Sequence, residues 1–369
     1  MQNPKVSVIV PVYNGEKFIR DTLQMLLRSS LYDIEIIVID DGSEDSSISI
    51  CKTMAEQDPR IRVYYQQNTG VFGARNHGLQ VARGEFICFC DQDDIVEQIA
   101  YEKMYEAACI YDCDVVMAST GKLVGDKKEA FENLPDAVFE GDEVRKNCML
   151  PILFNGTYWY SFLNELRLEN DIWKCMIKRK FINKHALVFR HFVNFEDDFL
   201  FLLDVLARTE KVATISAVLY YWRINLKSET YNTAYVNGLY DKDIRLQKEI
   251  MNIMENARID KEYIEVYEQF QNCNRYIHMI ENECRNVQAN WLKRIDNIKI
   301  IQKEAAFFKS LHIRKKYRKN LVHRKIVLEL LAHNNFVLAY CFHVVYIMVR
   351  KFFLRFKFWT YIENFLYKR

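Results

Sequence analysis

Short apolar runs alternate with amphipathic stretches in the first part of the chain. The apolar runs are rich in Val and Ile and end in polar or turn residues, as expected of strands that are buried on both faces. The stretches between them carry apolar residues at helical spacing. The expected elements are strands at residues 6–10, 34–39, 62–65 and 86–90, and helices at residues 17–29, 46–55 and after Gly73. This order predicts an α/β sheet with right-handed strand–helix–strand crossovers.

The pattern changes twice farther along the chain. Residues 110–230 mix strands with helices, and from residue 235 onward the pattern is helical throughout. The expected elements of the mixed portion are strands at residues 114–119 and 212–222 and helices at residues 142–150 and 199–207. We therefore predict an α/β domain over residues 1–230 and a helical C-terminal region over residues 231–369.

The composition is typical of a folded protein of the cytosol. Hydrophobic residues make up 50% of the 369 residues, and only 11 Gly and 5 Pro occur, which argues against a disordered or low-complexity chain. None of the 10 cysteines forms a CxxC pair, so buried reduced thiols are favoured over zinc sites or disulfides. The apolar run near the N-terminus is too short for a signal peptide and is interpreted as the first strand.

Basic residues are concentrated at the C-terminal end. The formal net charge is +2, but residues 309–369 hold fourteen Lys and Arg against two acids. The apolar run at residues 336–349 is shorter than the roughly 20 residues that cross a bilayer. Lys and Arg mixed with aromatic residues favour a segment that lies on an anionic membrane surface. An oligomer interface is the next alternative, nucleic acid is not expected as a partner, and the oligomeric state is left open.

Acidic residues directly follow the strand predicted at residues 86–90. They are Asp91, Asp93 and Asp94, with Gln92 among them. Carboxylates so close together repel one another unless a cation lies between them, and Mg²⁺ or Mn²⁺ prefers carboxylate and phosphate oxygens as ligands. A metal-bound diphosphate is therefore the predicted occupant of this loop. For Asp94 an alternative is the N-cap of a helix that begins in residues 95–100.

Two further polar segments precede predicted helices on the same side of the sheet. Asp40 and Asp41 end the second strand, where a carboxylate either shapes the turn or binds a base N–H or a ribose hydroxyl. Residues 68–76 form a predicted loop with two glycines and Arg75. Glycine lets a phosphate approach the backbone, and an arginine can bind phosphate oxygens with two nitrogens.

A second acidic cluster comes before the helix predicted at residues 199–207. It consists of Glu196, Asp197 and Asp198. A carboxylate held among like charges can have a pKa that lets it accept a proton from a sugar hydroxyl, which is the task of a general base. The alternative is a helix start, where acids are favoured by the positive end of the helix dipole.

Six motifs occur in an order and spacing similar to those of one enzyme family. They are VSVIVPVYNGEKFI, IIVIDDGSEDSS, NTGVFGARNHGL, RGEFICFCDQDD, DIWKCMIKRKF and FEDDFLF. Over residues 5–230 the chain resembles the family 2 glycosyltransferases of the GT-A fold. The resemblance implies an inverting reaction, in which an acceptor hydroxyl attacks the anomeric carbon of a nucleotide sugar while the diphosphate leaves on the opposite face.

The resemblance also implies roles for residues at the matching positions. Asp93 and Asp91 match the outer acids of a D-x-D motif that holds Mn²⁺ or Mg²⁺, and Asp197 matches the catalytic base. The residues implied on the donor side are Pro11, Asp41, Asn68, Arg75, Asp91, Gln92, Arg223 and Ser228. Those implied on the acceptor side are Trp173, Lys174 and Glu196.

Some positions depart from the family pattern or have a second interpretation. Gln92 replaces the small residue usual between the two acids, and Phe72 stands where a smaller polar residue is common. Arg223 would neutralise charge on the leaving diphosphate. For Trp173 and Lys174, the alternative interpretation is a packed Trp beside a surface Lys.

Together these observations predict a cytoplasmic glycosyltransferase, peripheral on the inner face of the membrane. It would move a sugar from a nucleotide sugar, with UDP as the favoured nucleotide, to a hydroxyl of a surface glycan or a lipid-linked oligosaccharide. The alternative is a carbohydrate-binding or scaffold protein on an inactive transferase fold, which the presence of Asp41, Asp93 and Asp197 disfavours. A nucleotidyltransferase would carry a Gly-rich triphosphate loop after its first strand, which PVYNGEKF lacks.

Overall fold

The protein is described by a computed structural model over residues 4–125, 127–154, 168–192, 197–224 and 235–302, with short pieces between residues 330 and 345. The chain separates into two compact units. One comprises Met1–Tyr231 with Asn252–Ile259, and the other comprises Asn232–Met251 with Asp260–Arg369. Two independent domains that meet at residue 230 remain a prediction.

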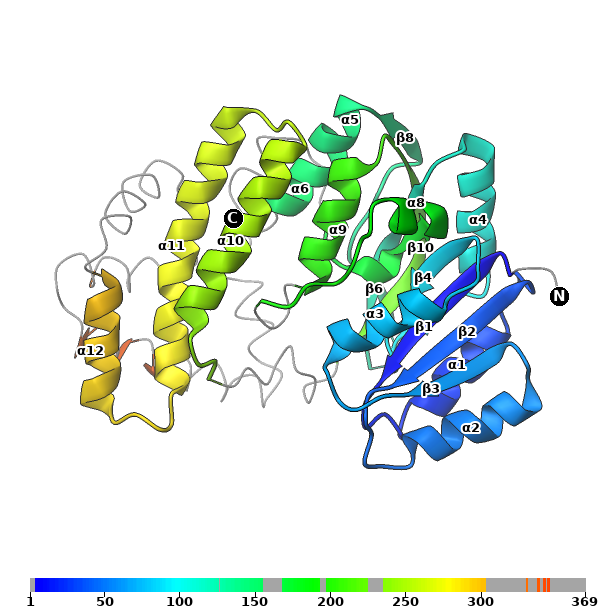
Figure 1. The fold of residues 1–369 in the computed structure, drawn as a ribbon, viewed down its shortest axis with the longest axis horizontal. Helices are drawn as coiled ribbons and strands as arrows, with labels where there is room; N and C mark the ends of the chain where they lie inside the picture. The colour runs from blue at the N-terminus through cyan, green and yellow to red at the C-terminus, as the bar shows by residue number, and fades with distance from the viewer. Residues whose placement is uncertain are drawn as a thin grey trace. The chain divides into compact units, whose positions relative to one another are not determined.

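A mixed sheet of ten strands forms the centre of the first unit (Figure 1). The strands are β1 Val6–Val12, β2 Ile34–Asp40, β3 Ile61–Tyr65, β4 Phe86–Phe89, β5 Ile95–Val96, β6 Val115–Val124, β7 Lys127–Ala130, β8 Ala137–Glu140, β9 Cys175–Lys178 and β10 Lys211–Arg223. Their order is β3-β2-β1-β4-β9-β6-β10-β5, with β7 beside β6 and β8 beside β10. The first four strands run parallel, whereas β9 is antiparallel to both of its neighbours. The predicted α/β sheet is confirmed.

Helices of the first unit connect these strands. They are α1 Ile19–Leu27, α2 Ser47–Gln57, α3 Val71–Val81, α4 Ala100–Tyr111, α5 Asp142–Val144, the π-helical turn η1 Arg145–Met149, α6 Leu150–Leu153, the 3₁₀ turn η2 Ile172–Lys174, α8 Arg179–Lys184 and α9 Asp197–Arg208. The strands and helices predicted up to residue 90 are present, with shifted ends. The helix predicted after Gly73 begins earlier, at Val71, so the expected loop of residues 68–76 is mostly helical.

Both faces of the sheet are covered, which explains the continuous apolar runs. Every residue of β1 and β2 is buried. Side chains alternate between faces along a strand, and those of Val8 and Val10 share one core with α1, α2 and α4. Ile9 points to the other face, where α3 lies so close that a Cβ on Gly78 would come within 2.4 Å of Ile9 Cγ2. Only glycine permits this approach, which holds α3 against the centre of the sheet.

The second unit is helical in the part that the structure describes, as predicted. Its helices are α10 Leu239–Asn256, α11 Lys261–Arg285 and α12 Trp291–Gln302, and the end of α10 is grouped with the first unit. The side-chain amide of Asn282 donates to Val236 O at 2.9 Å and accepts from Val236 N at 2.8 Å, which fixes the segment before α10. Among the described residues, no helix has the length and hydrophobicity to cross a membrane.

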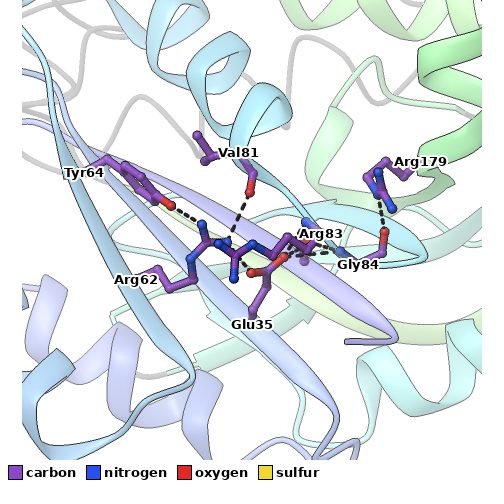
Figure 2. Close-up of polar contacts among 8 residues, drawn as sticks. Glu35, Arg62, Tyr64, Val81, Arg83, Gly84 and Arg179 are labelled. Atoms are coloured by element: carbon purple, nitrogen blue, oxygen red, sulfur yellow. Dashed lines mark hydrogen bonds and ion pairs between the residues drawn. The ribbon is translucent and has the colours of Figure 1, made fainter. Parts of the chain in front are cut away.

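A buried carboxylate links the amino ends of the central strands (Figure 2). Glu35, near the start of β2, is buried. It accepts hydrogen bonds from Ser7 Oγ, Arg62 Nη1 and Arg83 N at 2.6 Å each and from Gly84 N at 3.2 Å. These donors come from β1, from β3 and from the turn before β4, so one carboxylate fixes the register of all four parallel strands at this end. The loops that carry the predicted site follow the opposite ends of the same strands.

Replacing Glu35 should destabilise the fold. In Glu35→Gln an amide NH2 group replaces one buried carboxylate oxygen and cannot accept a hydrogen bond, and the Arg62 charge loses its anionic partner. We therefore expect the free energy of unfolding to fall by about 3 kcal/mol. Chemical denaturation measures this change. Glu56→Gln, on an exposed position of α2, is the matched control and should change stability by less than about 0.5 kcal/mol. Equal stability of the two variants would contradict the structural role of Glu35.

Candidate functional site

Arg75 connects the two acidic clusters. It lies in α3 and is buried, with a side-chain exposure of 4%. Its Nη2 donates to Asp91 Oδ1 at 3.0 Å, and its Nη1 forms an ion pair with Asp198 at the start of α9. The guanidinium also lies over the ring of Phe189, 5.5 Å from its centroid. The loop after β4 and the start of α9, far apart in sequence, therefore meet on one cation.

The charges around Arg75 depend on one another. Burial raises the pKa of Asp198 to about 6; the Arg75 charge acts against this rise, and the charges of Asp91 and Asp197 add to it. For Arg75, burial alone lowers the pKa, but the charges of Asp198 and Asp91 outweigh burial and leave the pKa raised. The predicted contact of Arg75 with a nucleotide remains a prediction, because both of its terminal nitrogens are held by carboxylates in this structure.

Tyr220 holds the acidic loop that follows β4. Its hydroxyl donates to Asp94 Oδ2 at 2.6 Å and accepts from Asp91 N at 3.1 Å. The ring of Trp173 stacks on the Tyr220 ring, with centroids 4.2 Å apart and planes 15° apart. Trp173 is thus packed, as its second interpretation expected, and it supports the loop from the side of η2. Its predicted contact with an acceptor remains a prediction.

Asp94 does not cap a helix, and this alternative is wrong. The residues after it form the short strand β5, and the next helix begins at Ala100 with Ile99 before it. The Asp94 carboxylate instead accepts from Tyr220 and, at 2.8 Å, from Arg223 N. Burial raises the pKa of Asp94 well above its ordinary value, and the nearby charges of Asp91 and Asp93 raise it further. Through these hydrogen bonds, the buried Asp94 side chain joins β10 to the acidic loop.

The acidic loop is also held from two other sides. The Gln92 amide accepts from Tyr13 N at 3.0 Å and donates to Tyr13 O at 3.1 Å, so it pairs with the backbone that follows β1. Arg223 Nε donates to the backbone oxygen of Asp93 at 2.7 Å. Through these contacts the Gln92 side chain links the acidic loop to the end of the neighbouring strand β1. Donor contacts by Gln92 and Arg223 remain predictions.

Asp41 organises the loop between β3 and α3. Its carboxylate accepts from Thr69 N at 2.9 Å, from Gly70 N at 2.8 Å and from the Gln66 amide at 2.7 Å. Gly70 has a φ of 88°, a conformation that favours glycine. Asn68 is an exposed residue of this loop. Asp41 thus shapes the loop, and its predicted contact with a base remains a prediction.

The end of β1 lies next to Asp41. Asp41 N donates to Val12 O at 2.8 Å, and Pro11 is buried within β1 opposite Ile39. Tyr13 follows directly, and 45% of its surface is exposed. An exposed aromatic ring at the carboxyl end of a central strand offers a flat surface to a base. The sequence analysis missed Tyr13, although its place directly after the first strand could have indicated it.

Lys174 is buried, so its interpretation as a surface lysine is wrong. Its Nζ donates to Glu132 Oε1 at 2.7 Å and also to Glu169 O. Glu132 accepts in addition from Glu169 N at 2.8 Å and from Thr120 Oγ1 at 3.1 Å. Both ends of this ion pair are fully buried and hydrogen-bonded, and the pair anchors the segment before β9 that carries Trp173. A role of Lys174 on the acceptor side remains a prediction.

Asp197, the predicted base, is the first residue of α9 and is paired with a histidine. Its two carboxylate oxygens lie 3.1 and 3.2 Å from His191 Nδ1. Burial raises the pKa of Asp197, whereas the hydrogen bond and charge of His191 and the charge of Arg75 lower it. No motif in the sequence pointed to His191. Glu196 and Ser228 lie outside the described residues.

The acidic loop provides ligands of the kind that a hard cation prefers. Asp91 and Asp93 carry carboxylate oxygens, and the Asp91 side chain is 33% exposed despite its bond to Arg75. Among the residues that the structure describes, no group of three or more His, Cys, Asp and Glu side chains could hold a metal ion. Two carboxylates fit an ion that takes its other ligands from water and from a diphosphate, as Mg²⁺ commonly does.

Comparison with known proteins identifies this arrangement. The sequence model of the family described as Glycosyl transferase family 2 matches residues 7–159, which include most of β1, all of β2 to β4 and the acidic loop. Over these residues the chain is similar to glycosyl transferase family 2. Arg75 lies on the matched segment, whereas Asp197 and Tyr220 lie beyond it.

Two curated relatives come from Bacillus subtilis (strain 168). The uncharacterized glycosyltransferase EpsJ is 33% identical over 227 residues, a match that spans 62% of this chain and 63% of EpsJ, just under two thirds of that relative. The putative glycosyltransferase EpsH is 28% identical over 325 residues, which span 84% of this chain and 87% of EpsH.

Solved structures show the same fold. The structure of S. aureus TarS 1–349 in complex with UDP-GlcNAc has a TM-score of 0.60, 18% identity, and coverage of 93% of this chain and 92% of TarS 1–349. Its complex with UDP has a TM-score of 0.58 at 16% identity. The predicted GT-A fold with a helical C-terminal region is thereby confirmed.

Removing the Tyr220 hydroxyl should destabilise the acidic loop. In Tyr220→Phe the buried Asp94 oxygen loses a donor and Asp91 N loses an acceptor, so we expect a loss of about 2 kcal/mol in the free energy of unfolding. Tyr221→Phe, on the next residue of β10, is the matched control, because no hydrogen bond of its hydroxyl is among the described contacts. Thermal unfolding measured by calorimetry compares the two. Similar unfolding temperatures would contradict the role of Tyr220.

Proposed function

We propose that the chain is an inverting glycosyltransferase that uses a nucleotide diphosphate sugar. The observation that carries the proposal is the bridge of Arg75, which brings the Asp91 loop and the start of α9 to one place. One acidic cluster then serves the diphosphate, and the other serves the acceptor hydroxyl. The match of residues 7–159 to glycosyl transferase family 2 supports this division of tasks.

The two acidic clusters would contribute at different points of the reaction. Asp93 and Asp91 would hold Mn²⁺ or Mg²⁺, which supplies positive charge to the diphosphate oxygens. Arg223 donates through Nε to the backbone oxygen of Asp93 and through its backbone N to the Asp94 carboxylate, and its charge would add positive charge near the leaving group. Asp197 provides the negative charge on which removal of the acceptor proton depends. The acceptor oxygen forms a bond to the anomeric carbon while the bond from that carbon to the diphosphate oxygen breaks.

We propose UDP as the nucleotide of the donor. The exposed ring of Tyr13, next to the loop that Asp41 organises, would give a uracil base a flat surface and nearby polar groups. TarS 1–349 of S. aureus, which has the same fold, was solved with UDP and with UDP-GlcNAc. For the acceptor we propose a hydroxyl of a surface glycan or of a lipid-linked oligosaccharide.

Nucleotide release from a panel of UDP-, GDP-, ADP- and TDP-sugars, with Mn²⁺ or Mg²⁺, tests this function. We expect release from a UDP-sugar that stops when a chelator is added. Asp93→Ala should lower this release at least about 100-fold, because it removes a metal ligand and leaves the diphosphate charge without its counter-ion. Asp21→Ala, on an exposed position of α1, should leave release unchanged. Absence of release from every sugar nucleotide, or full release in the chelator, would contradict the proposal.

We also propose that the basic C-terminal residues bind the anionic inner face of the membrane, which would bring the enzyme to a lipid-linked acceptor. Residues 309–325 carry eight Lys and Arg and no acid; they lie outside the described residues. Each basic residue near an anionic surface contributes about 1 kcal/mol to binding at physiological salt. Summed over the basic residues of this segment, contributions of this size are enough for reversible attachment to an anionic membrane.

Neutralising part of this segment should release the protein from vesicles. We expect the variant with Gln at Arg314, Lys315, Lys316, Arg318 and Lys319 to bind phosphatidylserine-containing vesicles at least about tenfold more weakly in sedimentation. The matched control has Gln at five exposed positions of the first unit, namely Arg28, Lys52, Lys103, Lys180 and Lys184. Equal loss of binding in both variants would show that net charge alone, rather than this segment, determines attachment.

A further inference from the structure

His191 covers the carboxylate that is proposed as the base. The Asp197 side chain is only 6% exposed, whereas the His191 side chain is 35% exposed. Both Asp197 oxygens lie within 3.2 Å of His191 Nδ1. A hydroxyl that approaches from solvent therefore reaches the imidazole more readily than the carboxylate behind it.

Phe72 fixes the plane of the His191 ring. The two rings are stacked, with centroids 4.6 Å apart and planes 9° apart. Phe72 lies in the first turn of α3, three residues before Arg75. The Phe72 ring thus contacts the histidine that contacts Asp197.

The contact with Asp197 determines which ring nitrogen is available. An ionised carboxylate only accepts hydrogen bonds, so Nδ1 carries the proton in this contact and Nε2 holds a free electron pair. Among the described residues, the hydrogen bonds of the His191 ring are all made by Nδ1. In the described part of the chain, the charged groups near this pair are Arg75, which lowers the pKa of Asp197, and Asp198, which is ion-paired with Arg75.

We infer that His191 is a catalytic residue whose Nε2 takes the proton from the acceptor hydroxyl, while Asp197 orients the ring and stabilises the imidazolium that forms. The inference rests on the proposed function and refines it. The acceptor O–H bond breaks and its proton goes to Nε2. The oxygen electron pair forms the new bond to the anomeric carbon, and the nucleoside diphosphate leaves with the electrons of the old bond. The imidazolium then loses its proton to water, which restores the pair.

Substitution by asparagine separates a catalytic role of His191 from a structural one. In His191→Asn the side-chain amide can replace Nδ1 as a donor to Asp197, but it cannot accept a proton as Nε2 does. With the sugar nucleotide that the wild-type protein turns over, we expect kcat to fall at least about 100-fold and the KM for this donor to stay within about twofold. His185→Asn is the matched control. It changes the histidine that directly follows α8 and should keep wild-type kcat.

Two further measurements sharpen this test. Added imidazole should restore part of the activity of His191→Ala, because it replaces the missing proton acceptor, and it should not restore Asp197→Asn. The His191 ring resonances in ¹⁵N spectra are assigned as those that the wild-type protein shows and His191→Asn lacks. Without ligands, these resonances should report a proton on Nδ1 and none on Nε2. This measurement does not depend on turnover.

The outcomes distinguish this inference from the proposed function. Wild-type kcat in His191→Asn would overturn the inference and leave the transferase proposal intact, with Asp197 as the direct base. A proton on Nε2 in the wild-type spectra would also overturn it, since the electron pair would then face Asp197. Absence of nucleotide release from the wild-type protein with every sugar nucleotide would contradict the proposed function and the inference together.

Discussion

The site depends on a single buried cation between two carboxylates. Arg75 is held in α3, and α3 is held against the sheet by the close approach of Gly78 to Ile9. A guanidinium in this position needs negative partners, and it finds them in Asp91 and in Asp198, which is 123 residues away in sequence from Arg75. The need to neutralise one charge therefore brings the acidic loop and the start of α9 together. Their shared location is a consequence of electrostatics rather than of strand order alone.

The framework of this site could be predicted because its signals are local. Buried strands are continuous apolar runs, and polar residues at their ends mark the edge where parallel strands present their loops. Asp91 was found in this way and Asp197 as part of an acidic cluster before a predicted helix, and family resemblance gave them roles. At the other ends of the strands, Glu35 accepts hydrogen bonds from donors on neighbouring strands. Such a buried acid in a strand interior is visible in the sequence, although its partners are not.

The contacts that hold the site could not be predicted because they join distant segments. In the sequence, Tyr220 is one more aromatic residue of an apolar strand, and only the fold shows that its hydroxyl contacts Asp94. Lys174 reads as a surface residue, since nothing nearby in sequence shows the buried Glu132 that neutralises it. His191 stands in no motif. In each case the decisive fact is a partner from another element, and local propensity carries no information about that partner.

Their partners divide the acids of the two clusters into two groups. Asp94 is held by Tyr220 and the backbone N of Arg223, and Asp198 is held by Arg75. Their oxygens already have partners, so they support the loops. Asp91 keeps an exposed part of its side chain, and the buried Asp197 contacts the partly exposed ring of His191. In each cluster, an acid that is held by another element ties its segment to the rest of the fold, and it thereby fixes the position from which the neighbouring acid acts.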